Sequence, residues 1–138
     1  MTTPRRTSKP VFVGDVQIGG GAPVAVQSMC STDTSDVAAT VRQLHQLKDA
    51  GCDFIDVSSG GTDPKAKVQM GPGYQVPFAR EIKQRTGLAT MAVGMLTEAE
   101  QAEGVLAAGD ADMIAIARAV IDDPRWGWHA AVRLGDKH

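Results

Sequence analysis

The chain has 138 residues, enough for one domain of ordinary size and too few for two. Its 14 Lys and Arg residues against 16 Asp and Glu residues give a formal net charge of −2, which argues against nucleic acid or an anionic membrane as a partner. The hydrophobic share of 43% can support a core. A complete (β/α)8 barrel needs roughly 200–250 residues, so this length predicts at most about half of one.

The first third of the chain predicts a hairpin, a strand and a helix. Residues 11–18 (VFVGDVQI) are typical of a β-hairpin that turns at the central Gly-Asp pair. Residues 22–29 (APVAVQSM) are apolar and become polar at their end, as in a buried parallel strand that leads into a site. From Asp36 to Ala50, apolar residues recur at spacings of three and four, which predicts a helix that ends at Gly51.

The rest of the chain alternates strand and helix. The pattern predicts strands at 52–57, 88–95 and 112–117, helices at 76–86 and 97–109, and a last helix broken at Asp123-Pro124 into 118–121 and 124–134. Thr97 and Glu100 have the spacing of a capping box at a helix start. The polar loop between residues 58 and 73 is longer than most loops that only connect two elements, and loops of this length more often have a function.

The predicted fold class is α/β, with an N-terminal hairpin followed by four βα units in a single domain over residues 1–138. Alternating strands and helices imply parallel pairing with right-handed crossovers. Two architectures fit this pattern equally well. One is half of a TIM-type barrel, and the other is a small open three-layer sheet.

Functional residues of parallel α/β folds gather at the carboxyl ends of the strands. The last two strands end in Gly94-Met95 and in Ala117-Arg118, each pair just before a helix. Backbone amides at such turns and the Arg118 guanidinium suit a phosphate group. The alternative is a tight connection in which Arg118 caps carbonyls or pairs with Asp122.

Other polar candidates have ordinary structural explanations. Asp56 is either a polar group inside a barrel or a helix-capping partner, and Tyr74 either touches a ligand or anchors its loop. His45, His129, Trp126 and Trp128 are expected to pack or to face solvent. The spacing of the histidines predicts no metal site, and no catalytic set emerges.

The two cysteines and the chain start point to a cytoplasmic protein. Cys30 and Cys52 have neither the number nor the spacing of a disulfide framework or a CxxC site, so we interpret them as structural. The basic start is not followed by the apolar run of a signal peptide, and no segment of about 18 apolar residues is present.

Residues 54–135 resemble the C-terminal part of the old yellow enzyme family, the FMN-dependent ene reductases and NADPH dehydrogenases of the xenobiotic-reductase type. The matching segments are FIDVSSGG (54–61), PGYQVPFAREIK (72–83), TMAVGML (90–96), ADMIAIARAVIDDP (111–124) and RWGWHAAVRLG (125–135). The resemblance implies the last three βα units of a barrel. It also implies that Gly94, Met95, Ala117 and Arg118 occupy positions that hold the FMN phosphate.

Residues 5–52 instead resemble the start of 4-hydroxy-3-methylbut-2-enyl diphosphate synthase, an iron-sulfur enzyme of isoprenoid synthesis. The segments that carry this likeness are RRTSKPVFVGDVQIGGGAPVAVQSM (5–29), TDTSDVAATVRQL (32–44) and LKDAGCD (47–53). The resemblance implies the entry hairpin, first strand and first helix of a barrel. The arginine of that family's second strand is replaced here by Asp56.

The two resemblances together suggest a chimera that joins the families near residue 53. They imply that the early strands that hold the flavin ring, the substrate-orienting histidines, the catalytic tyrosine and the iron-sulfur cluster are missing. We therefore expect weak binding of FMN or of another phosphate-bearing small molecule by a homo-oligomer. The alternatives are a self-associating scaffold without a ligand and residual isoprenoid-diphosphate binding by Gln27, Ser28 and Asp33.

Overall fold

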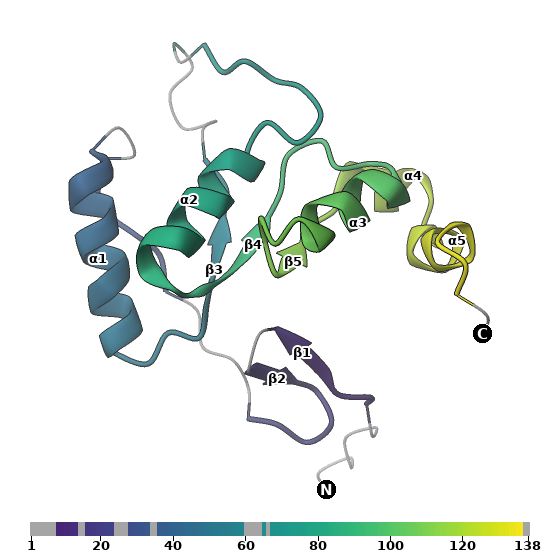
Figure 1. Cartoon of the computed structure of the whole chain (residues 1–138), viewed down its shortest axis with the longest axis horizontal. Helices are drawn as coiled ribbons and strands as arrows, with labels where there is room; N and C mark the ends of the chain where they lie inside the picture. The colour runs from purple at the N-terminus through teal and green to yellow at the C-terminus, as the bar shows by residue number, and fades with distance from the viewer. Residues whose placement is uncertain are drawn as a thin grey trace, which may run out of the picture.

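The computed structural model describes residues 8–13, 16–23, 28–33, 36–59, 65 and 67–136. Figure 1 shows a small hairpin set apart from a parallel sheet, with helices beside that sheet and the C-terminal helix at the far end. The elements in chain order are β1 (Val11–Val13), β2 (Val16–Ile18), α1 (Val37–Asp49), β3 (Phe54–Val57), α2 (Val76–Thr86), β4 (Ala89–Ala92), α3 (Ala99–Ala107), β5 (Met113–Ile114), α4 (Arg118–Asp122) and α5 (Trp126–Arg133).

The N-terminal hairpin is confirmed. β1 and β2 pair antiparallel, with Val11 opposite Ile18 and Val13 opposite Val16. The predicted turn residues between them lie outside the described part of the chain. The hairpin exposes Val11 and Phe12 to 61% each, so it contributes little to the core.

The second sheet is parallel, as the alternation of strands and helices predicts. Its order is β3-β4-β5, with Phe54 opposite Ala89 and Ala92 opposite Ile114. Because side chains alternate along a strand, Ile55 and Val57 share one face of the sheet while Phe54 and Asp56 share the other. The carboxyl ends of all three strands lie at one edge, where the connections to α2, α3 and α4 begin.

The core lies between one face of this sheet and the helices. Its buried residues are Val57, Val76, Ala79, Ala92, Leu96 and Ala111, with Ile55, Ile82, Val105 and Ile114 packed against them. Small alanines let α2 approach β4 closely, and Figure 1 shows α2 lying beside the sheet between α1 and α3. The amphipathic spacing of apolar residues therefore places the helices on a single face of the sheet.

Charged contacts join the helices to the amino ends of the strands. The Lys48 ammonium donates to the Thr86 carbonyl at 2.7 Å and so connects α1 with the end of α2. Asp112 accepts hydrogen bonds from Lys83 and from the Thr90 amide, both at 2.9 Å. These contacts lie opposite the carboxyl edge, where they serve stability.

Most predicted helices agree closely with the structure. The 76–86 helix has the predicted bounds, and α1 starts one residue after Asp36, whose carboxylate accepts from the Ala39 amide at 2.8 Å. The chain leaves the helix at Asp123, directly before proline, and α5 begins at Trp126. The interruption that Pro124 predicts is confirmed.

The predicted capping box at Thr97 is wrong. The residue that precedes the first turn of α3 is Glu98, and its side chain makes no capping hydrogen bond. The Thr97 amide bonds to Gln101, and Glu100 pairs with Arg133 of α5 instead of turning back to Thr97. A distant arginine thus outcompetes the local contact on which the prediction depended.

The strands are shorter than the apolar runs that predict them. β4 ends at Ala92 because Gly94 and Met95 have positive φ angles of 119° and 52°, which are incompatible with an extended strand. β5 has two residues, against six predicted. Of the predicted strand at 22–29, residues 24–27 lie outside the described residues, and the flanking residues are not in a strand.

The structure therefore shows a mixed α/β fold with a three-stranded parallel sheet. The first βα unit of the predicted half-barrel stays a prediction, because half of its predicted strand, residues 24–27, lies outside the described residues. None of the helices in the described ranges is long and apolar enough to cross a bilayer.

Candidate functional site

The four residues predicted to hold a phosphate follow two strands that end at the same edge of the sheet. β4 and β5 are parallel neighbours, and the Ala115 amide donates to the Ala92 carbonyl at 2.8 Å just beyond their pairing. Gly94-Met95 and Ala117-Arg118 follow these two strand ends. The topology thus places both turns at the carboxyl edge, as the sequence predicts for a parallel sheet.

Gly94 is a packing position. It is buried, and a Cβ atom built on it would lie 3.1 Å from two carbons of the Tyr74 ring and 3.2 Å from the Gln75 side chain. Its φ of 119° is also one that side-chain-bearing residues rarely adopt. The contact with the Tyr74 ring by itself requires a glycine here. Sequence reasoning missed this contact because Tyr74 and Gly94 belong to different segments of the chain.

Met95 follows in an unusual conformation. In the described part of the chain it is the one residue other than glycine with a positive φ. Its side chain is 37% exposed, and no described residue accepts a hydrogen bond from its amide. Such backbone conformations persist when the surroundings impose them, and they are common at ligand-binding turns.

Tyr74 and Gln75 hold this turn from the side. Gln75 is 4% exposed, and both ends of its amide are used: the oxygen accepts from the Ser59 amide, and the nitrogen donates to the Tyr74 hydroxyl at 2.9 Å. The Gly73 amide donates to the Gly94 carbonyl at 2.8 Å. Of the two interpretations of Tyr74, the structure supports the loop anchor.

Arg118 presents a free guanidinium at the second turn. The side chain is exposed, and it forms no hydrogen bond or ion pair with any residue that the structure describes. The predicted alternative, a pair with Asp122, is absent from the structure. An unpaired arginine at the carboxyl edge can bind a phosphate or carboxylate with two parallel hydrogen bonds.

Of the residues proposed for a diphosphate, Asp33 lies in the loop that precedes α1, and other residues of this loop bond to the helix. The Thr32 and Thr40 hydroxyls lie 2.8 Å apart, and the Ser31 amide donates to the Gln43 side chain at 2.9 Å. The Asp33 carbonyl accepts from the Asp36 amide at 3.0 Å. Ser28 is exposed, and Gln27 lies outside the described residues.

Asp56 lies on the sheet face that the helices leave uncovered. Asp56 is the register partner of Met91, and Met91 is the register partner of Met113. The three side chains therefore lie on the same face of the sheet, across three neighbouring strands. Burial raises its pKa above the ordinary value. Since no described residue bonds to its side chain, the helix-capping interpretation is not supported.

Both cysteines are free thiols. Burial, with a smaller contribution from Cys52, raises the pKa of the Cys30 thiol, so less of it is the reactive thiolate at neutral pH. The Cys52 thiol donates to the Phe54 carbonyl at 3.3 Å. In the ranges that the structure describes, no three His, Cys, Asp or Glu side chains gather closely enough to hold a metal ion.

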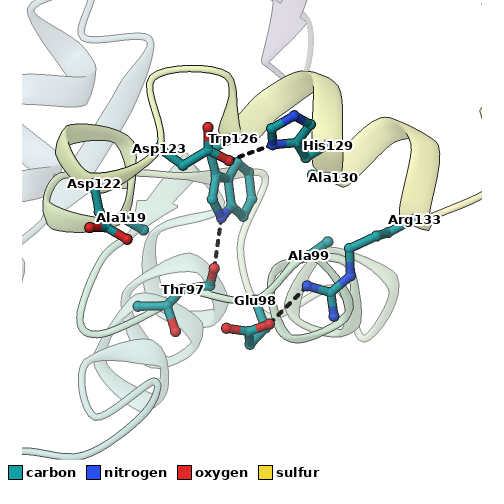
Figure 2. Close-up of a pocket in the computed structure, with 10 residues that line it drawn as sticks. All are labelled: Thr97, Glu98, Ala99, Ala119, Asp122, Asp123, Trp126, His129, Ala130 and Arg133. Atoms are coloured by element: carbon teal, nitrogen blue, oxygen red, sulfur yellow. Dashed lines mark hydrogen bonds and ion pairs between the residues drawn. The ribbon is translucent and has the colours of Figure 1, made fainter.

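A cavity of about 280 Å³ lies beside the two turns, between the start of α3, α4 and α5 (Figure 2). Its lining residues are Thr97, Glu98, Ala99, Ala119, Asp122, Asp123, Trp126, His129, Ala130 and Arg133. None of the four predicted phosphate-binding residues is among them. The Trp126 ring lies in the centre of the view, with its nitrogen directed at Thr97.

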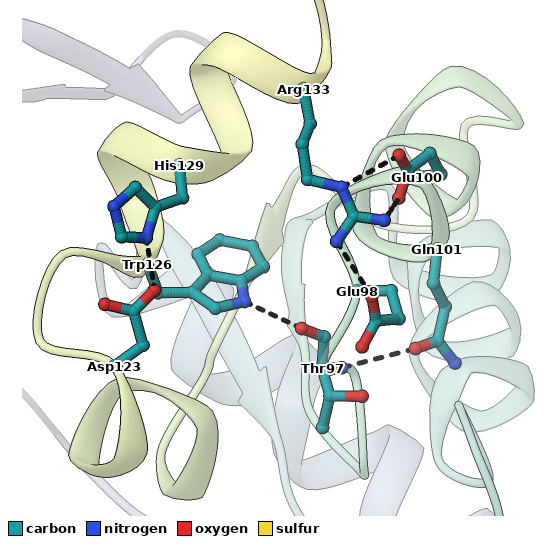
Figure 3. Close-up of polar contacts among 8 residues, drawn as sticks. All are labelled: Thr97, Glu98, Glu100, Gln101, Asp123, Trp126, His129 and Arg133. Atoms are coloured by element: carbon teal, nitrogen blue, oxygen red, sulfur yellow. Dashed lines mark hydrogen bonds and ion pairs between the residues drawn. The ribbon is translucent and has the colours of Figure 1, made fainter.

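Most charged groups of this cavity are already paired with one another (Figure 3). The Trp126 indole donates to the Thr97 carbonyl at 2.7 Å. Arg133 donates to Glu98 at 2.9 Å and, through two nitrogens, to Glu100. His129 bonds to Asp123 at 2.6 Å, and this bond lowers the pKa of the Asp123 carboxyl. The contacts dock α5 on α3, a role that the sequence predicted only as packing.

Comparison with known proteins finds one matching family profile. The GcpE TIM-barrel domain matches residues 8–103, which is more than half of the chain. This match begins near the predicted start of the isoprenoid-synthase likeness and extends well past residue 52, where we expected the likeness to end.

Individual relatives fall into two groups. The NADPH dehydrogenase of Geobacillus sp. strain WCH70 is 47% identical over 90 residues, which cover 65% of this chain and 26% of that protein. The 4-hydroxy-3-methylbut-2-en-1-yl diphosphate synthase (flavodoxin) of Ectopseudomonas mendocina is 59% identical over 79 residues, or 56% of this chain and 21% of the relative. The synthase of the same name from Magnetococcus marinus is 41% identical over 101 residues, or 69% of this chain and 26% of the relative.

Both resemblances seen in the sequence are thereby confirmed, as expected for a chimera of the two kinds of enzyme. The chain spans between a fifth and a third of the length of these curated relatives.

Proposed function

This chain belongs to the GcpE TIM-barrel domain family and is also similar to NADPH dehydrogenases, and on these premises we propose that it is a binding module for a phosphate-bearing small molecule, with FMN as the first candidate. The proposed ligand residues are Gly94 and Met95 after β4 and Ala117 and Arg118 after β5. We propose that residues 5–52 form a synthase-like part and residues 53–138 a reductase-like part, while the match to the GcpE domain continues to residue 103.

One observation carries this proposal. Arg118 is an exposed, unpaired guanidinium at the sheet edge where the Met95 amide has no described acceptor. A flavin phosphate is a dianion with several acceptor oxygens, so it can accept hydrogen bonds from both groups at once. Gly94 contributes the shape of the turn, because the Tyr74 ring covers it.

The proposal is one of binding. The resemblance to the reductases covers their last βα units, and the strands that hold the flavin ring and the catalytic tyrosine lie outside it. In this view the chain forms four βα units, about half of a TIM barrel. Hydride transfer would need the remaining strands of a barrel. The free thiols of Cys30 and Cys52 suit a cytoplasmic setting.

The test is a flavin titration of the purified chain, followed by the quenching of flavin fluorescence. We expect FMN to bind more tightly than riboflavin, which lacks the phosphate. Arg118→Met should weaken FMN binding about tenfold and leave riboflavin binding unchanged. Arg42→Met, which replaces an exposed arginine on α1, is the matched control. Absence of quenching, or equal quenching by both flavins, would overturn the proposal.

A second candidate is a self-associating scaffold without a ligand. Within the described sheet, the outer edges of β3 and β5 are unpaired, and Phe54, Met91 and Met113 lie on the face away from the helices. Exposed strand edges and apolar faces favour association with a second copy. We propose a homodimer in either case.

Residual diphosphate binding near Asp33 has the least support. The loop around it is bonded to α1 through Thr32 and Ser31, which leaves few of its polar groups for a ligand. We expect a cyclic isoprenoid diphosphate to leave the thermal midpoint of the chain unchanged. A concentration-dependent rise would revive this alternative.

A further inference from the structure

We infer that Tyr74 and Gln75 are positioning residues for the proposed phosphate site, although neither touches the ligand. The inference rests on the proposed function for its ligand and on the structure for its geometry. These residues lie in the loop before α2, remote in sequence from Arg118, and the two turns predicted from the sequence do not include them.

The first step is that Gln75 links the end of β3 to the Tyr74 side chain. Its side chain is almost fully buried, at 4% exposed. Its oxygen accepts from the Ser59 amide just after β3, and its nitrogen donates to the Tyr74 hydroxyl at 2.9 Å. A buried amide with both ends bonded has one orientation, because leaving either end unpaired costs the desolvation of that group.

The second step is that Tyr74 determines the conformation of the β4 turn. Its ring lies against Gly94 so closely that a methyl group on Gly94 would be 3.1 Å away. The Gly73 amide meanwhile bonds to the Gly94 carbonyl at 2.8 Å. The turn is thus held between a ring and a hydrogen bond from consecutive residues.

The third step is the consequence for Met95. Its positive φ of 52° is unfavourable for a residue with a side chain, so the turn needs external support to persist. The contacts of Tyr74 and Gln75 supply that support. They keep the Met95 amide in one orientation, and a preorganised donor binds an anion more tightly than a mobile one.

The experiment compares Tyr74→Phe and Gln75→Leu with the unsubstituted chain. Tyr74→Phe keeps the ring over Gly94 but leaves the Gln75 amide without its acceptor, so it disturbs the network mildly. Gln75→Leu removes both of its hydrogen bonds. Gln84→Leu, at an exposed position of α2, is the matched control. Dissociation constants are measured for FMN and for riboflavin, and the order parameter of the Met95 amide is measured by nitrogen-15 relaxation NMR.

We expect Tyr74→Phe to weaken FMN binding roughly threefold to tenfold, with riboflavin affinity unchanged within about twofold. Gln75→Leu should have the larger effect, and the order parameter of the Met95 amide should fall in both variants. Unchanged FMN affinity in a folded variant would contradict the inference. Equal losses for both flavins would indicate a purely structural role and would also contradict it.

The inference and the proposed function fail separately. If the unsubstituted chain binds no flavin, the proposed function is wrong. The order parameter of the Met95 amide then decides whether Tyr74 and Gln75 hold the turn. An order parameter that stays the same in both variants would overturn the positioning role.

Discussion

At the scale of single residues, Gly94 combines two constraints that rarely coincide. Its backbone angle is unfavourable for any side chain, and the Tyr74 ring occupies the space that a Cβ would need. We expect Gly94→Ala to destabilise the fold by about 1–3 kcal/mol, measured by urea unfolding.

The matched control is Gly104→Ala. Gly104 lies within α3, and a Cβ there would meet nothing within 4 Å. Alanine should stabilise the helix by roughly 0.5–1 kcal/mol because it forms helix more readily than glycine. If Gly94→Ala behaved like this control, the close contact with Tyr74 would be refuted.

The raised pKa of Asp56 predicts that the stability of the folded chain depends on pH. Burial raises its pKa in the folded chain, so the folded state holds this proton more tightly than the unfolded state. Stability should therefore fall as the pH rises from the ordinary aspartate pKa of about 3.9 through the raised value. Asp56 is exposed, and solvent screening therefore limits the effect. Asp56→Asn removes this loss, so its thermal midpoint should exceed that of the unsubstituted chain by about one degree near pH 7.

The gain from Asp56→Asn should vanish near pH 3, where both forms of the site are neutral. Asp53→Asn, at the exposed position three residues earlier, serves as the control. Thermal unfolding followed by circular dichroism at both pH values measures the effect. A gain of the same size at both pH values would exclude titration of Asp56 as the cause.

At the scale of elements, α5 depends on one aromatic contact. The Trp126 indole donates to the Thr97 carbonyl at 2.7 Å, across 29 residues of sequence. Trp126→Phe keeps most of the ring but loses this donor, so it should cost about 0.5–1.5 kcal/mol, which corresponds to a drop of a few degrees in the thermal midpoint.

Trp128 offers the control for that prediction. It is 73% exposed and contacts the Arg125 guanidinium at 5.9 Å from the ring centre. Trp128→Phe should change the thermal midpoint by less than about one degree, because exposed contacts of this kind contribute little. Equal losses in the two variants would argue against a specific role of the Trp126 hydrogen bond.

The helices show which local signals can be predicted reliably. The bounds of α2 follow from Pro77 near its start and Gly87 after its end, and both effects act within a few residues. The capping box at Thr97 fails although its spacing is correct. Glu100 there has a second partner, Arg133, which lies 33 residues away and cannot be seen from local spacing.

At the scale of the whole molecule, the uncovered face of the sheet predicts self-association. We expect light scattering to give a mass near twice the 14.5 kDa of one chain, increasing with concentration. Met113→Arg, on the uncovered face, should shift the chain toward the monomer because a buried, unpaired charge opposes association.

Met70→Arg is the control for the dimer. Met70 is 61% exposed in the loop before α2 and away from the sheet. It should leave the mass unchanged. A monomer at every concentration would refute the dimer, and the loss of the dimer in both variants would place the interface elsewhere.

The sequence by itself determined the order of the elements, the parallel character of the sheet and the two kinds of relatives. These properties depend on periodicity, on proline and glycine positions and on contiguous motifs, all of which act over short stretches of chain. The edge that carries Gly94 and Arg118 also follows, because parallel strands end on one side.

Only the tertiary structure decided what surrounds those residues. The Tyr74 ring over Gly94, the bond of Gln75 to Ser59 after β3 and the pairing of Arg133 with Glu100 join segments that are distant in the sequence. Such contacts depend on which groups the packing of helices on the sheet brings within reach. Spacing along the chain does not show which groups the fold brings together. For this reason the sequence predicts a ligand contact at the Gly94 turn, and the structure adds a packing contact with Tyr74 that the sequence did not predict.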